Sequence, residues 1–244
     1  MTFTATFLFH DSLNDFLRKF QKQQRLEYKF EGKPSVKDAI EAQGVPHPEI
    51  AQILVDGEPV SFQYLLKPND FVEVFPATKN QIPEAKLLQP KLPETIRFVL
   101  DVHLGKLAKA LRMLGFDTVY RNDLDDKTIA ELAQNENRIV LTRDVNLLKM
   151  KAINWGYWLR SQFLEEQLAE VIQYFKLQNK FAPFTRCLEC NGLIHEVRKE
   201  DVLGVLPPNT RKYFSEFYQC ESCRKVYWKG SHYERMQQFI DNFQ

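Results

Sequence analysis

The pattern of hydrophobic and polar positions changes along the chain, and its first part predicts a small α+β domain. Residues 3–9 alternate as a β-strand does, and residues 26–30 are extended. Between them, one face of a predicted helix carries the apolar residues Leu13, Phe16, Leu17 and Phe20. Ser35 and Asp38 give the capping signal of a second helix, which Gly44 ends. Residues 53–60 predict a hairpin, and residues 71–75 predict a last strand.

Three segments of this first domain, residues 1–76, carry a resemblance to β-grasp, ubiquitin-like domains related to sulfur carriers: residues 34–38, 55–60 and 70–76. Those carriers end in a Gly-Gly whose carboxylate is activated. Here Pro76 is followed by Ala77 and Thr78, and the chain continues, so sulfur transfer is not expected. The resemblance implies instead a module that binds a protein partner or presents a substrate. Residues 77–94, rich in proline and without apolar periodicity, are predicted to be a linker.

After this linker, strand and helix patterns alternate over residues 95–180. Strand patterns occupy residues 96–100, 118–120, 138–142 and 153–159. The first helical stripe consists of Leu104, Leu107, Ala108, Leu111 and Leu114, and further helices are predicted from about Asp125 and over residues 164–175. This alternation is typical of a parallel α/β sheet.

Acidic residues lie at the positions where these predicted strands or loops are followed by helices. Asp101 and Asp144 each follow a strand pattern, and the carboxyl ends of parallel strands meet at one edge of a sheet. Asp126 lies in an acidic loop between them, with Asp125 as the predicted N-cap. Convergent carboxylates suit Mg²⁺ or Mn²⁺, which can activate water against a phosphodiester. The alternative is that these aspartates only cap helices and complement their dipoles.

Basic residues flank the acidic positions and are candidate contacts for substrate phosphates. Lys106 and Arg112 lie on the helix after Asp101, largely off its apolar stripe, and Arg143 precedes Asp144. The alternative reading is an ordinary solvated face.

The four cysteines occur only as two C-x-x-C pairs, separated by 29 residues. Cys187 and Cys190 form the first pair, and Cys220 and Cys223 form the second. Four thiolates with this spacing predict a closed, structural zinc site. Residues 181–244 are therefore predicted to be a zinc ribbon.

Aromatic and basic residues mix after the second cysteine pair, in a pattern that can stack unpaired bases and bind phosphate. Tyr227 and Trp228 equally suit the small core of a ribbon, and we favour that structural role for them. His232 either contacts RNA or only anchors the last helix.

The chain holds 33 basic and 32 acidic residues, so it has no large net field for nucleic acid, and any such contact needs a local patch. No apolar stretch has the length of a membrane span, and the N-terminus lacks a signal pattern. A cytoplasmic protein without a membrane partner is expected.

Residues 101–118, 125–126 and 138–144 together resemble the Mut-seven C-terminal RNase family, PIN-like domains fused to a zinc ribbon. The resemblance covers about residues 96–232 and implies that Asp101, Asp126 and Asp144 hold the catalytic metal. A fourth acid common in PIN domains is not identifiable, so one-metal and two-metal chemistry both stay open. The expected fold is a PIN-like α/β domain between a β-grasp domain and a zinc ribbon. The expected function is a metal-dependent ribonuclease acting on single-stranded RNA; the alternative is a noncatalytic RNA-binding or adaptor protein.

Overall fold

The computed structural model describes residues 1–76 and 87–243. The chain divides into two compact units, one made of Met1–Glu94 and Asp125–Trp158 and the other of Thr95–Leu124 and Leu159–Gln244. The first part of the predicted linker, residues 77–86, lies outside the described residues. Its remainder is anchored, because Leu88 N donates to Ala51 O over 2.8 Å and Trp155 Nε1 donates to Pro90 O over 3.0 Å.

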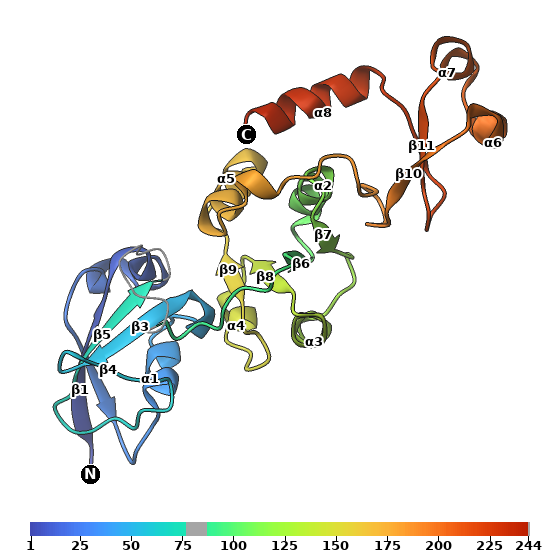
Figure 1. Cartoon of the computed structure of the whole chain (residues 1–244). Helices are drawn as coiled ribbons and strands as arrows, with labels where there is room; N and C mark the ends of the chain where they lie inside the picture. The colour runs from blue at the N-terminus through green and yellow to red at the C-terminus, as the bar shows by residue number, and fades with distance from the viewer. Residues whose placement is uncertain (77–86, 244) are drawn as a thin grey trace. The chain divides into compact units, whose positions relative to one another are not determined.

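The first unit begins with a five-stranded mixed sheet of order β2-β1-β5-β3-β4, drawn in blue to teal in Figure 1. β1 and β5 are parallel, and the other neighbours are antiparallel. Helix α1 (Val36–Ala42) contributes Val36, Ala39 and Ile40 to the same core as the strands. The predicted strands are confirmed as β1 (Phe3–Phe9), β2 (Leu26–Phe30), β3 (Ile50–Val55), β4 (Glu58–Pro59) and β5 (Phe71–Pro76).

Local signals explain the turns of this sheet domain. Ser35 Oγ accepts from Asp38 N over 3.1 Å and donates to Asp38 Oδ2 over 2.7 Å, which closes the predicted cap of α1. Asp56 and Gly57 have φ of 50° and 85°, the left-handed conformations that a two-residue hairpin turn requires. The hairpin pairs Val55 with Glu58 as predicted.

The predicted helix over residues 13–20 is wrong. Two short 3₁₀ turns, Asp11–Phe16 and Lys19–Gln21, replace it, and Phe20 is 73% exposed. The side chain of Asn14 is the physical reason, because its Nδ2 donates to Phe9 O and its Oδ1 accepts from Gln23 N over 2.6 Å. Those bonds offer the backbone an alternative to a continuous helix.

The same unit also holds α3 (Asp126–Glu136), β8 (Ile139–Thr142), α4 (Val145–Leu148) and β9 (Gly156–Trp158), with β8 and β9 parallel. A 3₁₀ turn at His47–Glu49 joins this part to the sheet domain. His47 contacts Glu41 Oε1 at 2.7 Å and Ile153 O at 2.9 Å through its two ring nitrogens, and Trp158 N donates to Glu49 Oε1 over 2.8 Å. Polar groups buried at this junction are thereby paired.

The second unit begins with a parallel strand pair and the helix α2 (Gly105–Met113), and α5 (Leu164–Tyr174) and α8 (Ser231–Asp241) are its other longer helices. β6 (Arg97–Leu100) pairs in parallel with β7 (Asp117–Val119). Each unit thus has a parallel strand pair with helices between its strands in the sequence, so the predicted α/β class is confirmed. Helix α2 buries the predicted stripe, and α5 follows β9 along the chain.

The C-terminal part of this unit has an antiparallel sheet of order β10-β11-β12. Helix α7 begins at Pro208, and proline is favoured at the first helical position. A small core holds Val202, Leu206 and Phe217. The elements are β10 (Ile194–Val197), α6 (Lys199–Val202), α7 (Pro208–Tyr213), β11 (Phe217–Cys220), β12 (Val226–Tyr227) and α8 (Ser231–Asp241), with 3₁₀ turns at Gln178–Lys180 and Leu203–Val205.

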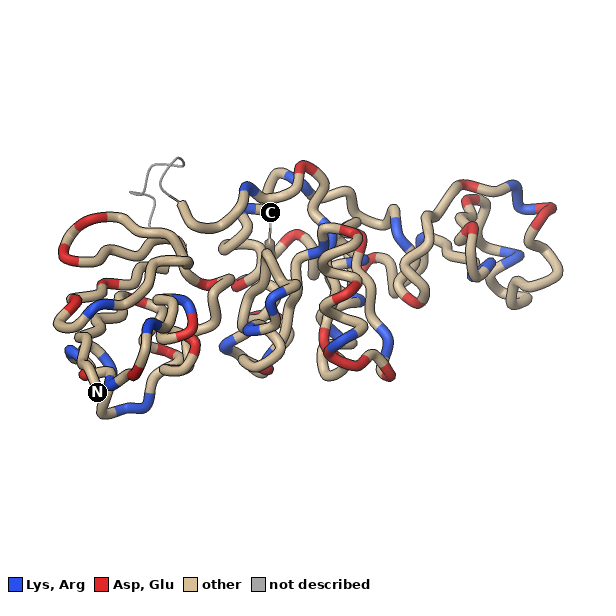
Figure 2. The backbone as a smooth tube through the Cα atoms, turned by 90° about the horizontal axis from the view of Figure 1, so that it is seen from below, with Lys and Arg blue, Asp and Glu red and all other residues tan. Residues whose placement is uncertain are grey.

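Charged residues of both signs are interspersed along the backbone (Figure 2), and the net charge of the chain is +1. Within residues 1–76 and 87–243, every helix is too short or too polar to cross a bilayer.

Candidate functional site

The four cysteines come together in two turns of the C-terminal sheet. Cys187 and Cys190 precede β10, while Cys220 ends β11 and Cys223 lies in the turn to β12. Their four Sγ atoms all lie within 4.8 Å of one another. The clustering predicted from the two C-x-x-C pairs is therefore confirmed.

The backbone gives both pairs the same knuckle. Asn191 N donates to Cys187 O over 2.9 Å, and Arg224 N donates to Cys220 O over 3.1 Å. Asn191 and Arg224 follow their cysteine pairs directly and have φ of 70° and 63°. This left-handed step reverses the chain just after the second cysteine, so that both thiols of a pair share one side of the turn.

The donor set fits a zinc ion. The Sγ atoms of Cys187 and Cys223 are 3.6 Å apart, and those of Cys190 and Cys220 are 3.4 Å apart. Thiolates about 2.3 Å from a tetrahedral zinc are about 3.8 Å from one another, whereas disulfide sulfurs are about 2 Å apart. The arrangement is consistent with a closed zinc ribbon, whose metal has no open position for catalysis.

Tyr227 supports the first knuckle. Its hydroxyl lies 3.0 Å from Cys187 Sγ and accepts from Leu188 N over 3.3 Å. Burial opposes ionisation of Cys187, but hydrogen bonds from Tyr227 and from the Cys190 backbone lower the pKa of Cys187 to about 6. Trp228 packs against the small ribbon core. Trp228 thus has the core role that we favoured, whereas Tyr227 supports the knuckle from outside the core cluster.

Arg112, expected among the substrate contacts, is buried and only 3% exposed. Its Nε donates to Thr118 O over 3.0 Å, and its Nη1 donates to Leu188 O over 3.0 Å and Glu189 O over 2.9 Å. Burial lowers the pKa of Arg112. The charge of the nearby Cys187 sulfur acts in the opposite direction and raises this pKa. Arg112 fastens the first knuckle to α2 and β7, and we leave it out of the proposed substrate surface.

Two of the acidic residues follow strands, as predicted. Asp101 comes directly after β6, and its Oδ1 accepts from Val102 N over 2.6 Å. Asp144 follows β8 and is the N-cap of α4, where its Oδ1 accepts from Asn146 N over 2.8 Å. In each case a backbone amide fixes one carboxylate oxygen.

The other two acidic residues open α3. Asp125 is the N-cap, as predicted, and its Oδ1 accepts from Thr128 N over 2.7 Å. Hydrogen bonds from Thr128 lower the pKa of the Asp125 carboxyl. Asp126 is the first helical residue, so its side chain is not needed for the cap.

A groove of about 410 Å³ brings two of the predicted substrate contacts together in the second unit. Lys106 from α2 and His232 from the first turn of α8 both line it, beside Arg235. Lys109 also lines it but is paired with Glu189 at 3.3 Å. The remaining lining residues are apolar: Ala110, Met113, Leu164, Leu188, Met236 and Phe239. The groove therefore has an apolar floor and a cationic rim.

The remaining predicted contact, Arg143, belongs to the first unit, where its side chain is exposed and its carbonyl accepts from Trp158 Nε1 over 3.1 Å. The phosphate contact assigned to Arg143 stays a prediction.

The family model of the Mut7-C RNAse domain matches residues 96–240, more than half of the chain. The chain belongs to this family. The Mut7-C match contains Asp101, Asp126 and Asp144 together with all four cysteines. A model described as Mut7-C ubiquitin matches residues 2–82, over the N-terminal sheet. The predicted family and the predicted order of its domains are confirmed.

Among curated proteins, this Mut7-C member is similar to the exonuclease mut-7 homolog of Homo sapiens. The two are 33% identical over 127 residues, which cover 48% of this chain and 14% of the human protein. The chain thus spans only a small part of that relative's length. No solved structure matches the chain.

Sequence reasoning missed the role of Asn191 in this Mut7-C chain. Its Oδ1 accepts from Thr118 N over 2.9 Å, and its Nδ2 donates to Asp117 Oδ1 over 2.8 Å. An asparagine directly after a C-x-x-C pair suits a left-handed turn, but its partners lie more than 70 residues earlier. Arg235 was also missed, because only the fold brings it beside Lys106.

Proposed function

We propose that this Mut7-C family member is a metal-dependent ribonuclease that hydrolyses RNA phosphodiester bonds. The observation that carries the proposal is the RNAse-domain match over residues 96–240, which contains the three acidic positions. Asp101, Asp126 and Asp144 would hold Mg²⁺ or Mn²⁺, and Asp125 would assist from the cap of α3. The name of the human relative, an exonuclease, supports a nuclease of this general class.

The carboxylates suit this role because of what their own residues do. A carboxylate has about four lone-pair sites, and the amides of Val102 and Asn146 each use one. These bonds orient the carboxylates of Asp101 and Asp144 at the ends of their strands. A divalent ion supplies, when bound, an activated water and a positive charge beside the phosphoryl oxygens.

The geometry also gives the rival hypothesis one favourable observation. Asp125 and Asp144 act as N-caps, which is the role expected if the acidic residues were purely structural. In that case the protein would be a noncatalytic RNA-binding or adaptor protein. We rank it second, because the family match concerns an RNAse domain and covers all the acidic positions.

The N-terminal sheet domain supports a second part of the proposal. Its Mut7-C ubiquitin match covers residues 2–82, and ubiquitin-like folds commonly serve as recognition modules. We propose that this domain binds a protein partner.

The test is cleavage of matched RNA and DNA oligonucleotides with Mn²⁺, Mg²⁺ or EDTA. The double variant Asp101→Asn, Asp144→Asn keeps the side-chain size and removes both charges. We expect metal-dependent cleavage of single-stranded RNA, reduced in the double variant on the order of 100-fold, as when a main charge-stabilising group is lost.

Asp201→Asn is the matched control, since Asp201 is exposed in α6 and pairs with Arg198 at 3.0 Å. Zinc content is measured in every sample, so that loss of the ribbon is not mistaken for loss of catalysis. If the folded wild-type protein cuts no substrate with either metal, the ribonuclease proposal is refuted. Cleavage retained by the double variant would show that the site is misplaced.

A further inference from the structure

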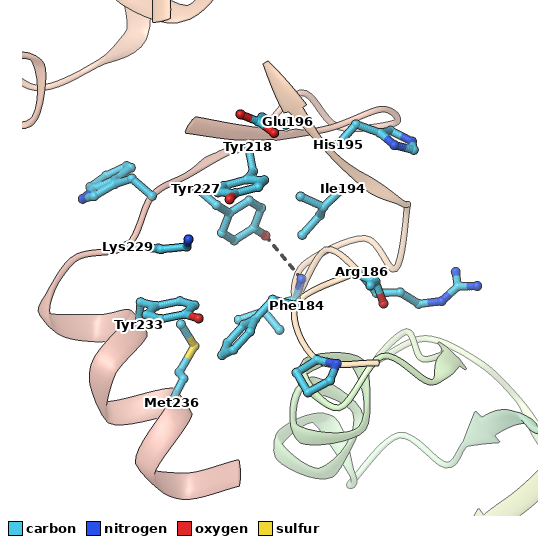
Figure 3. A pocket seen from close by; sticks show the side chains of 14 residues that line it. Phe184, Arg186, Ile194, His195, Glu196, Tyr218, Tyr227, Lys229, Tyr233 and Met236 are labelled. Atoms are coloured by element: carbon cyan, nitrogen blue, oxygen red, sulfur yellow. Dashed lines mark hydrogen bonds between the residues drawn. The ribbon is translucent and has the colours of Figure 1, made fainter. Parts of the chain in front are cut away.

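A second cavity lies in the C-terminal part of the chain, against the start of α8 (Figure 3), with a volume of about 450 Å³. Aromatic side chains form its walls. Figure 3 shows Tyr218 and Tyr227 on one side and Phe184 and Tyr233 on the other, with the ammonium group of Lys229 pointing between them. A space walled by aromatic rings is the shape that a flat, unsaturated ring system fills.

Most of these rings are not required by the ribbon core. That core consists of Val202, Leu206 and Phe217, with Val197, Phe214, Val226 and Trp228 packed against it. Tyr218, Tyr233 and Phe184 stand outside it and are half-buried. The rings of Phe184 and Tyr233 lie 4.6 Å apart at 37°, so they hold each other in place at the cavity wall.

Charge distinguishes this cavity from a phosphate site. Lys229 pairs with Glu216 at 2.8 Å, Arg186 pairs with Asp117 at 3.6 Å, and His195 lies 3.2 Å from Glu221. Each cationic side chain at the cavity therefore has an acidic partner. An aromatic cavity with compensated charge favours the face of a base over a phosphate group.

The cavity adjoins the groove between α2 and α8. Leu188 and Met236 line both, and the groove carries Lys106, His232 and Arg235 at its rim. Stacking surfaces beside a cationic track are how proteins bind single-stranded nucleic acid. Lys106 is also only five residues after Asp101, on the helix that follows this aspartate.

We propose that the aromatic cavity stacks unpaired bases of single-stranded RNA, while the rim of the groove binds the adjoining phosphates. The RNA strand then runs from the ribbon along α8 to the start of α2. This inference rests on the proposed function for the nature of its ligand, and it assigns base stacking to residues far along the sequence from the acidic positions.

The experiment measures binding of a fluorescent, mixed-sequence 12-nucleotide RNA by anisotropy, with a duplex of the same sequence for comparison. The full chain carries Asp101→Asn and Asp144→Asn in all samples, so that the RNA stays intact. Tyr233→Leu and Tyr218→Leu each remove a ring while keeping apolar volume. We expect each to weaken single-strand binding about 10-fold, since stacking contributes about 1–3 kcal/mol per base.

Tyr213→Leu is the matched control, because Tyr213 is 69% exposed on α7 and does not line the cavity. It should leave the affinity unchanged, and Tyr233→Phe, which keeps the ring, should retain most of it. Lys106→Ala and Arg235→Ala should instead lower the salt dependence, by about 0.7 in the log–log slope for each lost phosphate contact. Zinc content and circular dichroism confirm that each variant is folded.

The outcomes separate this inference from the proposed function. Single-strand affinity that is the same in Tyr233→Leu, Tyr218→Leu and Tyr213→Leu overturns the base-stacking site, even if the wild type cuts RNA. The cavity would then suit another ligand, such as an apolar peptide. If binding depends on the rings while the wild type cuts no RNA, the result supports the site and refutes the ribonuclease proposal. Absence of binding to either RNA refutes the site as well.

Discussion

The N-terminal sheet domain and the C-terminal ribbon differ in what stabilises them. The core of the sheet domain contains 16 buried residues, drawn from all its long strands, from α1 and from the intervening segments. The ribbon core contains three, and its sheet has one strand of only two residues. A small region with so little buried apolar surface needs another source of stability. We propose that zinc held by the four clustered thiols provides it, because metal binding in such domains is coupled to folding.

The largest expected effect is that metal removal separates these two regions. Structural zinc binds to zinc-finger peptides with about 10–16 kcal/mol, so chelation should unfold residues 187–227 and leave the N-terminal sheet intact. Hydrogen exchange read by mass spectrometry, before and after chelation and after zinc is restored, measures this. Cys187→Ser should reproduce the chelated state. Unchanged protection of the ribbon without metal would contradict the comparison.

The reverse experiment weakens the hydrophobic core. Phe7 is fully buried, and Phe7→Ala should destabilise the N-terminal domain by about 3–5 kcal/mol, without changing the zinc affinity of the ribbon. Phe20→Ala is the control, since Phe20 is 73% exposed and should change stability by about 0.5 kcal/mol or less. Exchange rates over residues 3–76 and a zinc competition assay measure the two effects. A loss of zinc affinity in Phe7→Ala would show that the ribbon depends on the N-terminal core for its stability.

A smaller effect is expected where the ribbon joins α2. Arg112→Ala leaves the buried carbonyl of Thr118 without this donor, at a cost of about 1–3 kcal/mol, and the part-buried carbonyls of Leu188 and Glu189 lose the same donor at a smaller cost. We expect faster zinc release to a coloured chelator, with Arg112→Lys in between, because one ammonium cannot reproduce the fork. Lys109→Ala removes only an exposed pair and is the control. Equal rates of zinc release in all variants would show that Arg112 does not stabilise the knuckle.

The smallest effect compares the two knuckles with each other. Arg224 and Asn191 have the same left-handed conformation. Arg224→Gly should therefore change stability by less than about 1 kcal/mol, since easier backbone geometry offsets a more flexible unfolded chain. Asn191→Gly keeps the geometry but loses the bonds to Thr118 and Asp117, so it should release zinc faster. If the two glycine variants behave alike, the side-chain bonds of Asn191 contribute nothing measurable.

Sequence patterns predicted the elements wherever a local signal decided them. The period-two strands, the capping residues Ser35 and Asp125 and the Asp56-Gly57 turn all act within a few residues, and the structure has each of them. The cysteine clustering was also predictable, because a four-thiolate site demands two such pairs. The convergence of Asp101, Asp126 and Asp144 stays a prediction.

The sequence-based predictions failed where the role of a residue depends on a partner that lies far away in the sequence. Arg112 reads as a cation on a helix surface, and only the fold brings two carbonyls more than 70 residues away against it. Likewise, nothing local shows that Asn14 reaches Gln23 and interrupts the predicted helix before Phe20. Phe184 and Tyr233 are 49 positions apart, so their shared cavity could not be anticipated from spacing.

The three bonds of Arg112 determine where this chain can be shortened. One acceptor precedes the predicted boundary between residues 180 and 181, and the other two follow it. A truncated protein that ends at residue 180 would leave the Arg112 guanidinium with one of its three carbonyl partners and would expose the faces of α2 and β7 that the knuckle covers. The smallest fragment in which to test the proposed nuclease activity therefore retains the ribbon, even though zinc takes no part in the proposed chemistry.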